Sequence, residues 1–77
     1  MSLGFVLLQC DEGNENKVLK KLGQIKGVKE THETHGLYNA VVKIETNSHK
    51  QLKQICNEKI RVLSGVRSTL TLIEDFQ

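Results

Sequence analysis

Three histidines and two cysteines are the side chains of this sequence best suited to hold a metal ion. His32 and His35 stand three positions apart in a segment that reads as a β-strand, and side chains three apart on a strand point to opposite faces. His49 falls in the first turn of a predicted helix, where we expect it to be exposed. Cys10 and Cys56 show none of the close spacing typical of zinc sites. We therefore expect no metal site and no cofactor.

The same residues do not form a set suited to covalent catalysis. A nucleophilic serine or cysteine needs a neighbouring base and a group that orients that base. Cys56 falls on the apolar side of a predicted helix, and Cys10 ends a strand without a basic neighbour in sequence. The six glycines are scattered at turns and helix ends, so they form no phosphate-cradling loop. We expect two reduced, mostly buried thiols and a protein that is not an enzyme.

Two short polar segments are better candidates for a binding site. A glycine-bearing turn leaves backbone N–H and C=O groups free, and hydroxyls on an edge strand add donors and acceptors. Such groups suit a small zwitterion such as an amino acid, although a hairpin turn and a β-branched edge strand would also explain both segments. The two segments consist of Gly36, Leu37, Tyr38 and Asn39, and of Ser68, Thr69, Leu70 and Thr71.

The elements that would position these segments occur twice. Each half of the chain begins with an apolar run and passes through a helix-like stretch, which ends at Gly27 or at Gly65. Asn14 and Ser48 are the expected N-caps, and Ser48 forms a capping-box pattern with Gln51. We predict strands at 4–10, 28–35, 38–46 and 66–74, helices at about 15–24 and 49–63, and a tail at 75–77.

The order of these elements predicts the fold. Right-handed crossovers place the apolar first and third strands in the centre of the sheet and the other two at its edges. The sequence therefore predicts a single domain, 1–77, of the α+β class. Its fold is ferredoxin-like βαββαβ, a four-stranded antiparallel sheet with two helices on one face, as in dimeric α+β barrels.

The sheet face without helices is expected to be apolar. The first strand is apolar at consecutive positions, and we expect Leu37, Val41 and Ile73 to add to the open face. A monomer would expose that face to water, so we expect a second copy of the chain to cover it. Scattered exposed apolar residues on a twisted sheet are the alternative.

Composition narrows the range of partners. The chain has 11 basic and 9 acidic side chains, a formal net charge of +2 and a pI of about 8.6, without the pronounced basic character of many nucleic-acid binders. The centre of the third strand lacks the aromatic residues on which RNA-recognition domains stack bases. No apolar run is long enough to cross a membrane, and no signal peptide is recognisable. We expect a cytoplasmic protein that binds neither nucleic acid directly nor membranes.

Two stretches of the sequence resemble a known family. Residues 28–44, with Gly36-Leu37-Tyr38-Asn39 at their centre, and residues 60–73, with Leu63-Ser64-Gly65-Val66-Arg67-Ser68-Thr69-Leu70-Thr71, resemble the C-terminal effector domain of the Lrp/AsnC transcription regulators. The resemblance covers about residues 4–74. It implies a ferredoxin-like fold that pairs through its sheet, assembles into rings such as octamers, and binds amino acids where dimers meet.

The resemblance also assigns roles to the two polar segments. It implies that Gly36, Leu37, Tyr38 and Asn39 line the turn side of the ligand pocket and that Ser68, Thr69, Leu70 and Thr71 are the strand-side candidates. The family's turn usually ends in Asp where this chain has Asn39, so effector specificity is expected to differ. The helix-turn-helix is missing, as in a stand-alone effector domain that modulates transcription without binding DNA. Full-length Lrp/AsnC regulators are possible partners. An ACT-like regulatory domain and a small dimeric α+β barrel enzyme are the alternatives.

Overall fold

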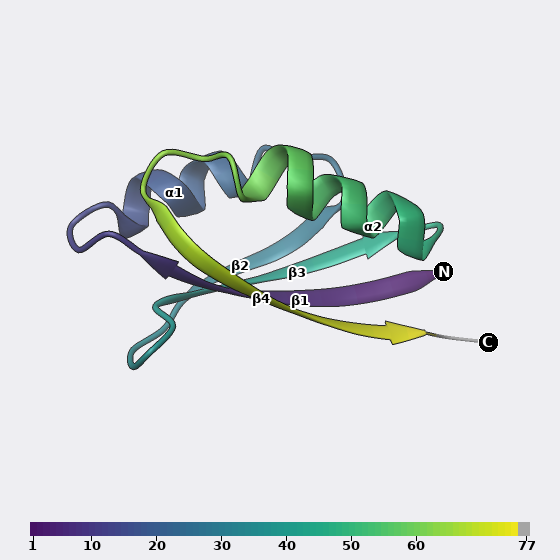
Figure 1. Ribbon diagram of the computed structural model, residues 1–77, viewed down its shortest axis with the longest axis horizontal. Coiled ribbons are helices and arrows are strands. Elements are labelled where there is room, and N and C mark those ends of the chain that lie inside the picture. The colour runs from purple at the N-terminus through teal and green to yellow at the C-terminus, as the bar shows by residue number, and fades with distance from the viewer. Residues whose placement is uncertain (76–77) are drawn as a thin grey trace.

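The computed structural model describes residues 1–75 and has the predicted βαββαβ order (Figure 1). Its four-stranded antiparallel sheet has the strand order β2-β3-β1-β4, and both helices lie on one face (Figure 1). The ferredoxin-like fold, with the first and third strands at the centre, is therefore confirmed. The elements are β1 (Ser2–Cys10), α1 (Glu15–Leu22), β2 (Val28–Glu33), β3 (Ala40–Thr46), α2 (His49–Ile55), the π-helical turn η1 (Cys56–Ile60) that continues α2, and β4 (Val66–Asp75).

The hydrophobic core lies between the sheet and the helices. Every second residue of β1 is fully buried against the helices, and the residues between them are half-buried on the open face. β3 shows the same alternation over most of its length. The unbroken apolar run of β1 suggests burial on both faces of the strand. In this chain only the face toward the helices is fully buried. The core consists of Val6, Leu8, Cys10, Val18, Leu22, Ala40, Val42, Ile44, Leu52, Cys56 and Ile60.

The second helix starts and packs as its sequence indicates. Gln51 N–H donates to Ser48 Oγ at 3.2 Å, and Gln51 Oε1 accepts from Asn47 N–H at 3.1 Å. In a capping box the Gln51 side chain would accept from the N–H of the N-cap Ser48, and here it accepts from the residue before it. A methyl group at Gly4 would come within 2.7 Å of Leu52 Cδ1, so a larger residue at this position of β1 would require the buried Leu52 side chain of α2 to shift. Asn14 precedes α1 as predicted but makes no capping side-chain bond.

The connection between β2 and β3 is longer than the tight turn that the sequence suggests. β2 ends at Glu33 rather than His35, and β3 starts at Ala40, so Tyr38 does not share a strand face with the core residues of β3. The six residues between the strands project from the sheet on the side away from the helices (Figure 1). His35 therefore lies in the loop and not on a strand.

The two faces of β4 are assigned by its register with β1. Val6 pairs with Thr71 and Leu8 with Thr69, so the threonines face the helices, whereas Leu70 lies on the open face beside Leu7. The prediction that Ile73 adds to the open face is wrong, because Ile73 pairs with the helix-facing Gly4. Leu70 and Leu72, 45% and 53% exposed, take that place.

Two further features complete the description of the chain. No helix within residues 1–75 is long and apolar enough to cross a membrane. The predicted tail begins at Asp75, which is still the last residue of β4. Phe76 and Gln77 lie outside the described residues.

Candidate functional site

The β2–β3 loop is closed by its own hydrogen bonds. Thr34 N–H donates to the Asn39 carbonyl at 3.1 Å, and Thr34 Oγ1 donates to the Tyr38 carbonyl at 2.9 Å. Gly36 has a φ of 123°, which side chains other than glycine rarely tolerate. Leu37 at the loop tip is 73% exposed. The loop therefore presents an apolar side chain and backbone groups at one end of the sheet.

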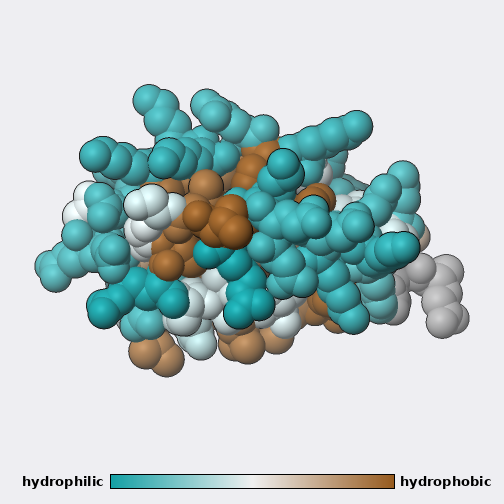
Figure 2. All heavy atoms as spheres, turned by 45° about the horizontal axis from the view of Figure 1, so that its top comes forward, coloured by the Kyte–Doolittle hydropathy of each residue, from teal (hydrophilic) through white to brown (hydrophobic). Residues whose placement is uncertain are grey.

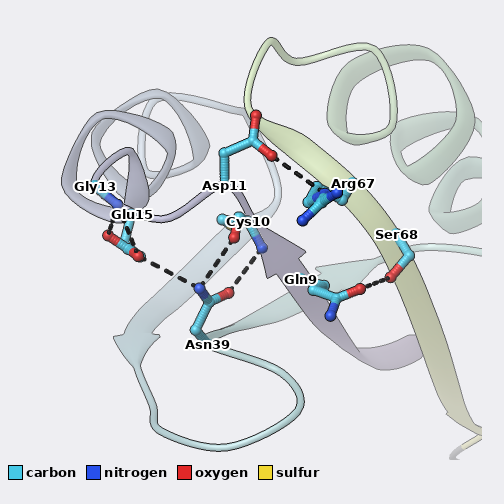
Figure 3. Close-up of polar contacts among 8 residues, drawn as sticks. All are labelled: Gln9, Cys10, Asp11, Gly13, Glu15, Asn39, Arg67 and Ser68. Atoms are coloured by element: carbon cyan, nitrogen blue, oxygen red, sulfur yellow. Dashed lines mark hydrogen bonds and ion pairs between the residues drawn. The ribbon is translucent and has the colours of Figure 1, made fainter.

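Asn39 fixes the base of this loop to the end of β1. Its backbone N–H donates to the Leu8 carbonyl at 3.0 Å. Its side chain bonds both backbone groups of Cys10, accepting from the N–H at 2.8 Å and donating to the carbonyl at 3.1 Å (Figure 3). Asn39 Nδ2 also donates to Glu15 Oε1 at 3.4 Å. The side chain thus extends the β1–β3 pairing by one step and contacts the start of α1.

The four candidate residues of β4 divide between the two faces of the sheet. Thr69 and Thr71 face the helices, and Thr71 Oγ1 lies 3.8 Å from Cys56 Sγ. Ser68 and Leu70 lie on the open face. Ser68 Oγ donates to Gln9 Oε1 at 3.0 Å (Figure 3). Ser68 and Leu70 therefore share a face, and a ligand on that face could not contact all four side chains of one protomer.

The structure brings the two predicted segments to the same end of the sheet but not into direct contact. Asn39 reaches β1 from one side at Cys10, and Ser68 reaches it from the other side at Gln9 (Figure 3). β1 runs between them, as the strand order requires. A ligand that touches both segments would therefore have to span β1 or sit where a second protomer brings its own copy of one segment.

Acidic side chains surround this end of the sheet. Glu15 accepts from Gly13 N–H with both carboxylate oxygens, at 3.1 and 3.2 Å, and Asp11 pairs with Arg67 at 3.3 Å (Figure 3). Burial raises the pKa of the Cys10 thiol, and the negative charges of Glu15 and Asp11 raise it further. Cys10 is therefore held as a neutral thiol, which is unsuited to nucleophilic attack.

Among residues 1–75, aliphatic core side chains fill the space between the helices and the sheet, and Cys10 and Cys56 are the titratable residues among them. Burial raises the pKa of Cys56 as well. Within residues 1–75, no three His, Cys, Asp or Glu side chains gather closely enough to hold a metal ion.

An open groove of about 680 Å³ lies elsewhere, beside α2. Ile25 and Ile55 contribute apolar surface, and Lys26, Lys29 and Lys59 are among its polar lining residues. None of the eight predicted site residues lines this groove. The groove and the predicted ligand segments are therefore separate features of the molecule.

Sequence reasoning missed the partners of the predicted residues. Glu15, Gln9 and the backbone of Cys10 contact Asn39 or Ser68 across separations of 24 to 59 positions. No local pattern marks such contacts. The available signal was the predicted pairing of the first strand with both neighbours, which places its last residues between the two segments.

Comparisons with known proteins agree with this structure. Residues 3–74 match the profile of the family described as Lrp/AsnC ligand binding domain. A homocitrate synthase of Saccharolobus islandicus (strain L.S.2.15 / Lassen #1) is 40% identical over 67 residues, which make up 86% of this chain and 14% of that protein. The chain thus spans about one seventh of the curated relatives that it matches.

Two solved structures are similar along nearly their whole length. FFRP-DM1 is 36% identical with a TM-score of 0.92, over 97% of this chain and 100% of that chain. The hypothetical protein PHS023 from Pyrococcus horikoshii is 35% identical with a TM-score of 0.94, over 100% of this chain and 93% of that chain. The resemblance noted in residues 28–44 and 60–73 is therefore confirmed, and this chain belongs to the Lrp/AsnC ligand binding domain family.

Proposed function

We propose that this chain is an amino-acid effector-binding and assembly module that modulates transcription. The observation that carries the proposal is the position of the two family-like segments. Residues 36–39 and 68–71 lie on either side of β1, with Asn39 and Ser68 near the same end of the sheet. Gly36, Leu37, Ser68 and Leu70 are exposed, and no single protomer encloses them. Such a site would be completed by a second protomer, so binding of its ligand would depend on the assembly of the protomers.

The open sheet face supports the assembly part of the proposal. Half-buried and exposed apolar side chains extend across its three adjacent strands β3, β1 and β4: Leu3, Phe5, Leu7, Val41, Leu70 and Leu72. Contiguous apolar surface of this kind is uncommon on monomers and typical of subunit contacts. Domains of this family typically form oligomers. We propose a dimer through this face, a higher ring such as an octamer, and mixed assemblies with full-length Lrp/AsnC regulators.

The chemistry at the end of the sheet fits a small zwitterion. The loop contributes backbone groups near Gly36. The Ser68 hydroxyl on the open face and the Thr69 hydroxyl on the helix-facing side add donors and acceptors at opposite faces of the same strand. Asn39 is already bonded within the chain, so its role in the site is to position the loop. The carboxylates of Glu15 and Asp11 lie nearby and are the groups suited to an ammonium ion.

Thermal shift against each of the twenty amino acids tests ligand binding. A ligand that binds the native state alone raises the midpoint, and millimolar concentrations reveal weak sites. We expect one amino acid or one chemical class of amino acid to raise the midpoint, and Thr69→Val to reduce that shift. Thr31→Val on β2 is the matched control. If no amino acid raised the thermal midpoint, the ligand-binding part of the proposal would be rejected and only the assembly role would stand. If Thr69→Val left the increase in midpoint unchanged, Thr69 would be excluded from the site.

A second candidate function is control of an enzyme. It is favoured by the 40% identity to a segment of a homocitrate synthase, because that segment is part of a longer protein named as an enzyme. In that reading the module senses an amino acid on behalf of a biosynthetic enzyme. Affinity capture of the tagged chain from its own cells separates the two candidates. Recovery of a DNA-binding regulator supports the first, and recovery of a biosynthetic enzyme supports the second.

A further inference from the structure

The helix side of the molecule carries far more positive charge than the whole chain suggests. The helix layer, defined here as residues 15–26 and 48–64, contains eight of the eleven basic residues but only two acidic ones, Glu15 and Glu58. Its formal charge is therefore +6, against +2 for the whole chain. All eight basic side chains are exposed: Lys17, Lys20, Lys21, Lys26, Lys50, Lys53, Lys59 and Arg61.

Little within the chain offsets this charge. The Glu15 carboxylate is bonded to Gly13 N–H and reached by Asn39, at the margin of the layer. The ion pairs found on Glu30 and Asp11 both lie outside the layer. Within residues 1–75 none of the eight basic side chains forms an ion pair. Seen from the helix side, long hydrophilic side chains surround a central hydrophobic strip (Figure 2).

Several lysines of the helix layer lie close enough along the helices to repel one another. Lys17 lies three and four residues before Lys20 and Lys21, and Lys50 lies three before Lys53. Like charges at these spacings repel one another and destabilise a helix. Glutamates at some of these positions would instead have formed stabilising pairs. Lys20, Lys21 and Lys53 lie in the last turns of their helices, where positive charge interacts favourably with the helix dipole. Lys17 and Lys50 lie in the first turns, where positive charge is unfavourable. The positive charge of the layer is therefore only partly explained by helix stability, and it suits an anionic partner.

We infer that the basic helix layer binds the phosphate backbone of double-stranded DNA without reading its sequence. The charges are mostly lysines spread along both helices, which suits point contacts with phosphates. The two described aromatic residues, Phe5 and Tyr38, lie on the open face and in the β2–β3 loop, so the layer has no platform for stacking unpaired bases. The molecule is 39 Å long, about one turn of duplex DNA.

This inference departs from the expectation, based on net charge and missing aromatics, that the chain makes no direct contact with nucleic acid. Net charge hides the separation of the basic layer from the rest of the chain, whose formal charge is −4. The inference does not depend on amino-acid binding. Loss of either property in an experiment therefore leaves the other one untouched.

Fluorescence anisotropy with a labelled 30-base-pair duplex of random sequence tests the inference. We expect binding at 50 mM KCl that weakens steeply toward 200 mM, because phosphate contacts release counterions. The triple variant Lys17→Gln, Lys20→Gln and Lys53→Gln should lower affinity at least about tenfold at 50 mM. It should also flatten the slope of log affinity against log salt by roughly 2 to 3. Its thermal midpoint should stay close to that of the parent chain, because relief of like-charge repulsion offsets the lost interaction of Lys20 and Lys53 with the helix dipoles.

The matched control removes the same formal charge outside the layer, with Lys29→Gln, Lys43→Gln and Arg67→Gln. This variant should retain most of the affinity if both variants have native circular dichroism. Equal loss in the two triple variants would overturn the inference, because net charge alone would then explain binding. Absence of binding at 50 mM KCl, tighter binding of single-stranded DNA, or equal binding of a polyglutamate peptide would each overturn it as well.

Discussion

At the scale of single residues, Asn39 explains a departure from the family pattern. Its amide accepts from Cys10 N–H and donates to the Cys10 carbonyl, which a carboxylate could not do. It also approaches the Glu15 carboxylate at 3.4 Å, where an ionised Asp would meet a like charge. A neutral side chain that both donates and accepts is therefore matched to this position. We therefore expect Asn39 to position the β2–β3 loop, and the groups of that loop, not the Asn39 side chain, to contact a ligand.

Replacing Asn39 tests this positioning role. We expect Asn39→Ala to lower the free energy of unfolding by about 1–3 kcal/mol, because it leaves the partly buried Cys10 backbone groups without their partner. Urea unfolding followed by circular dichroism measures the change, and Asn16→Ala on the exposed side of α1 is the control. Asn39→Asp should be destabilising at pH 7 and less so near pH 4, where the carboxyl protonates. Equal stability of Asn39→Ala and the parent chain would show that the amide bonds contribute nothing.

Glu30 should make stability depend on acid pH. Hydrogen bonds from His32 and Lys43 hold the pKa of the Glu30 carboxyl below its ordinary value. A lowered pKa in the folded state means that this contribution is complete above the unfolded pKa and is lost as pH falls through the folded value. Glu30→Gln should therefore flatten the fall in thermal midpoint below about pH 5. Glu58→Gln is the charge-matched control, and identical pH profiles for both variants would contradict the role of Glu30.

The positions of these residues along the strands and loops were easier to predict from the sequence than their contacts. The sequence placed Ser68 on the fourth strand, where the structure has it, because strand patterns are local. The part of Asn39 and Ser68 in ligand binding stays a prediction. The sequence did not predict that Asn39 is used within the chain, since the bond to Cys10 joins residues 29 positions apart. The extent of β2 was also overestimated, because Thr34 and Asn39 close the loop through bonds that leave no trace in local composition.

At the scale of secondary-structure elements, β4 shows what alternation can and cannot establish. Alternation from Ser68 onward separates two sets of β4 residues, but it does not establish which set faces the helices, and the open face predicted for Ile73 was therefore wrong. The register with β1 decides this, and a bulge between Gln9 and Cys10 lets Val66 pack against the core. The leucines of β4 therefore face away from the helices, and the threonines face toward them.

This assignment predicts how β4 contributes to assembly. Leu70→Glu together with Leu72→Glu should shift the chain from an oligomer toward the monomer, because carboxylates would replace apolar surface at the contact. Val62→Glu, on an exposed side chain of the segment after η1, is the control and should leave the assembly intact. Sedimentation velocity at micromolar concentration measures both. An oligomer that survives the double substitution would exclude the open face as the contact.

At the scale of the whole molecule, the parts that stabilise the fold are separate from the surfaces proposed for association and ligand binding. The helices and the core provide stability, the open sheet face is available for association, and the two predicted ligand segments approach β1 near one end of the sheet. A domain this small buries a limited share of its surface, so association is also an effective source of stability. The family's role as a ligand-binding module fits this division, because a ligand at the margin of the contact can change the association.

The fold was predictable from the sequence, whereas the assembly of this chain stays a prediction. Doubled strand-helix-strand units with Gly27 and Gly65 at corresponding places predicted the strand order without further information. The charge of the helix layer was also present in the sequence. It became visible only in the fold, which puts α1 and α2 on the same face of the sheet (Figure 1) and leaves Lys17, Lys20 and Lys53 exposed. The relation between two copies of the chain depends on contacts that no single sequence pattern specifies.

Native mass spectrometry with and without each amino acid tests the central claim most directly, because it reports the order of assembly and ligand occupancy together. We predict a dimer or a higher ring, with an amino acid bound at stoichiometric occupancy and a shift in the distribution of assemblies upon binding. A chain that stays monomeric at micromolar concentration and retains no amino acid at millimolar concentration would contradict the account.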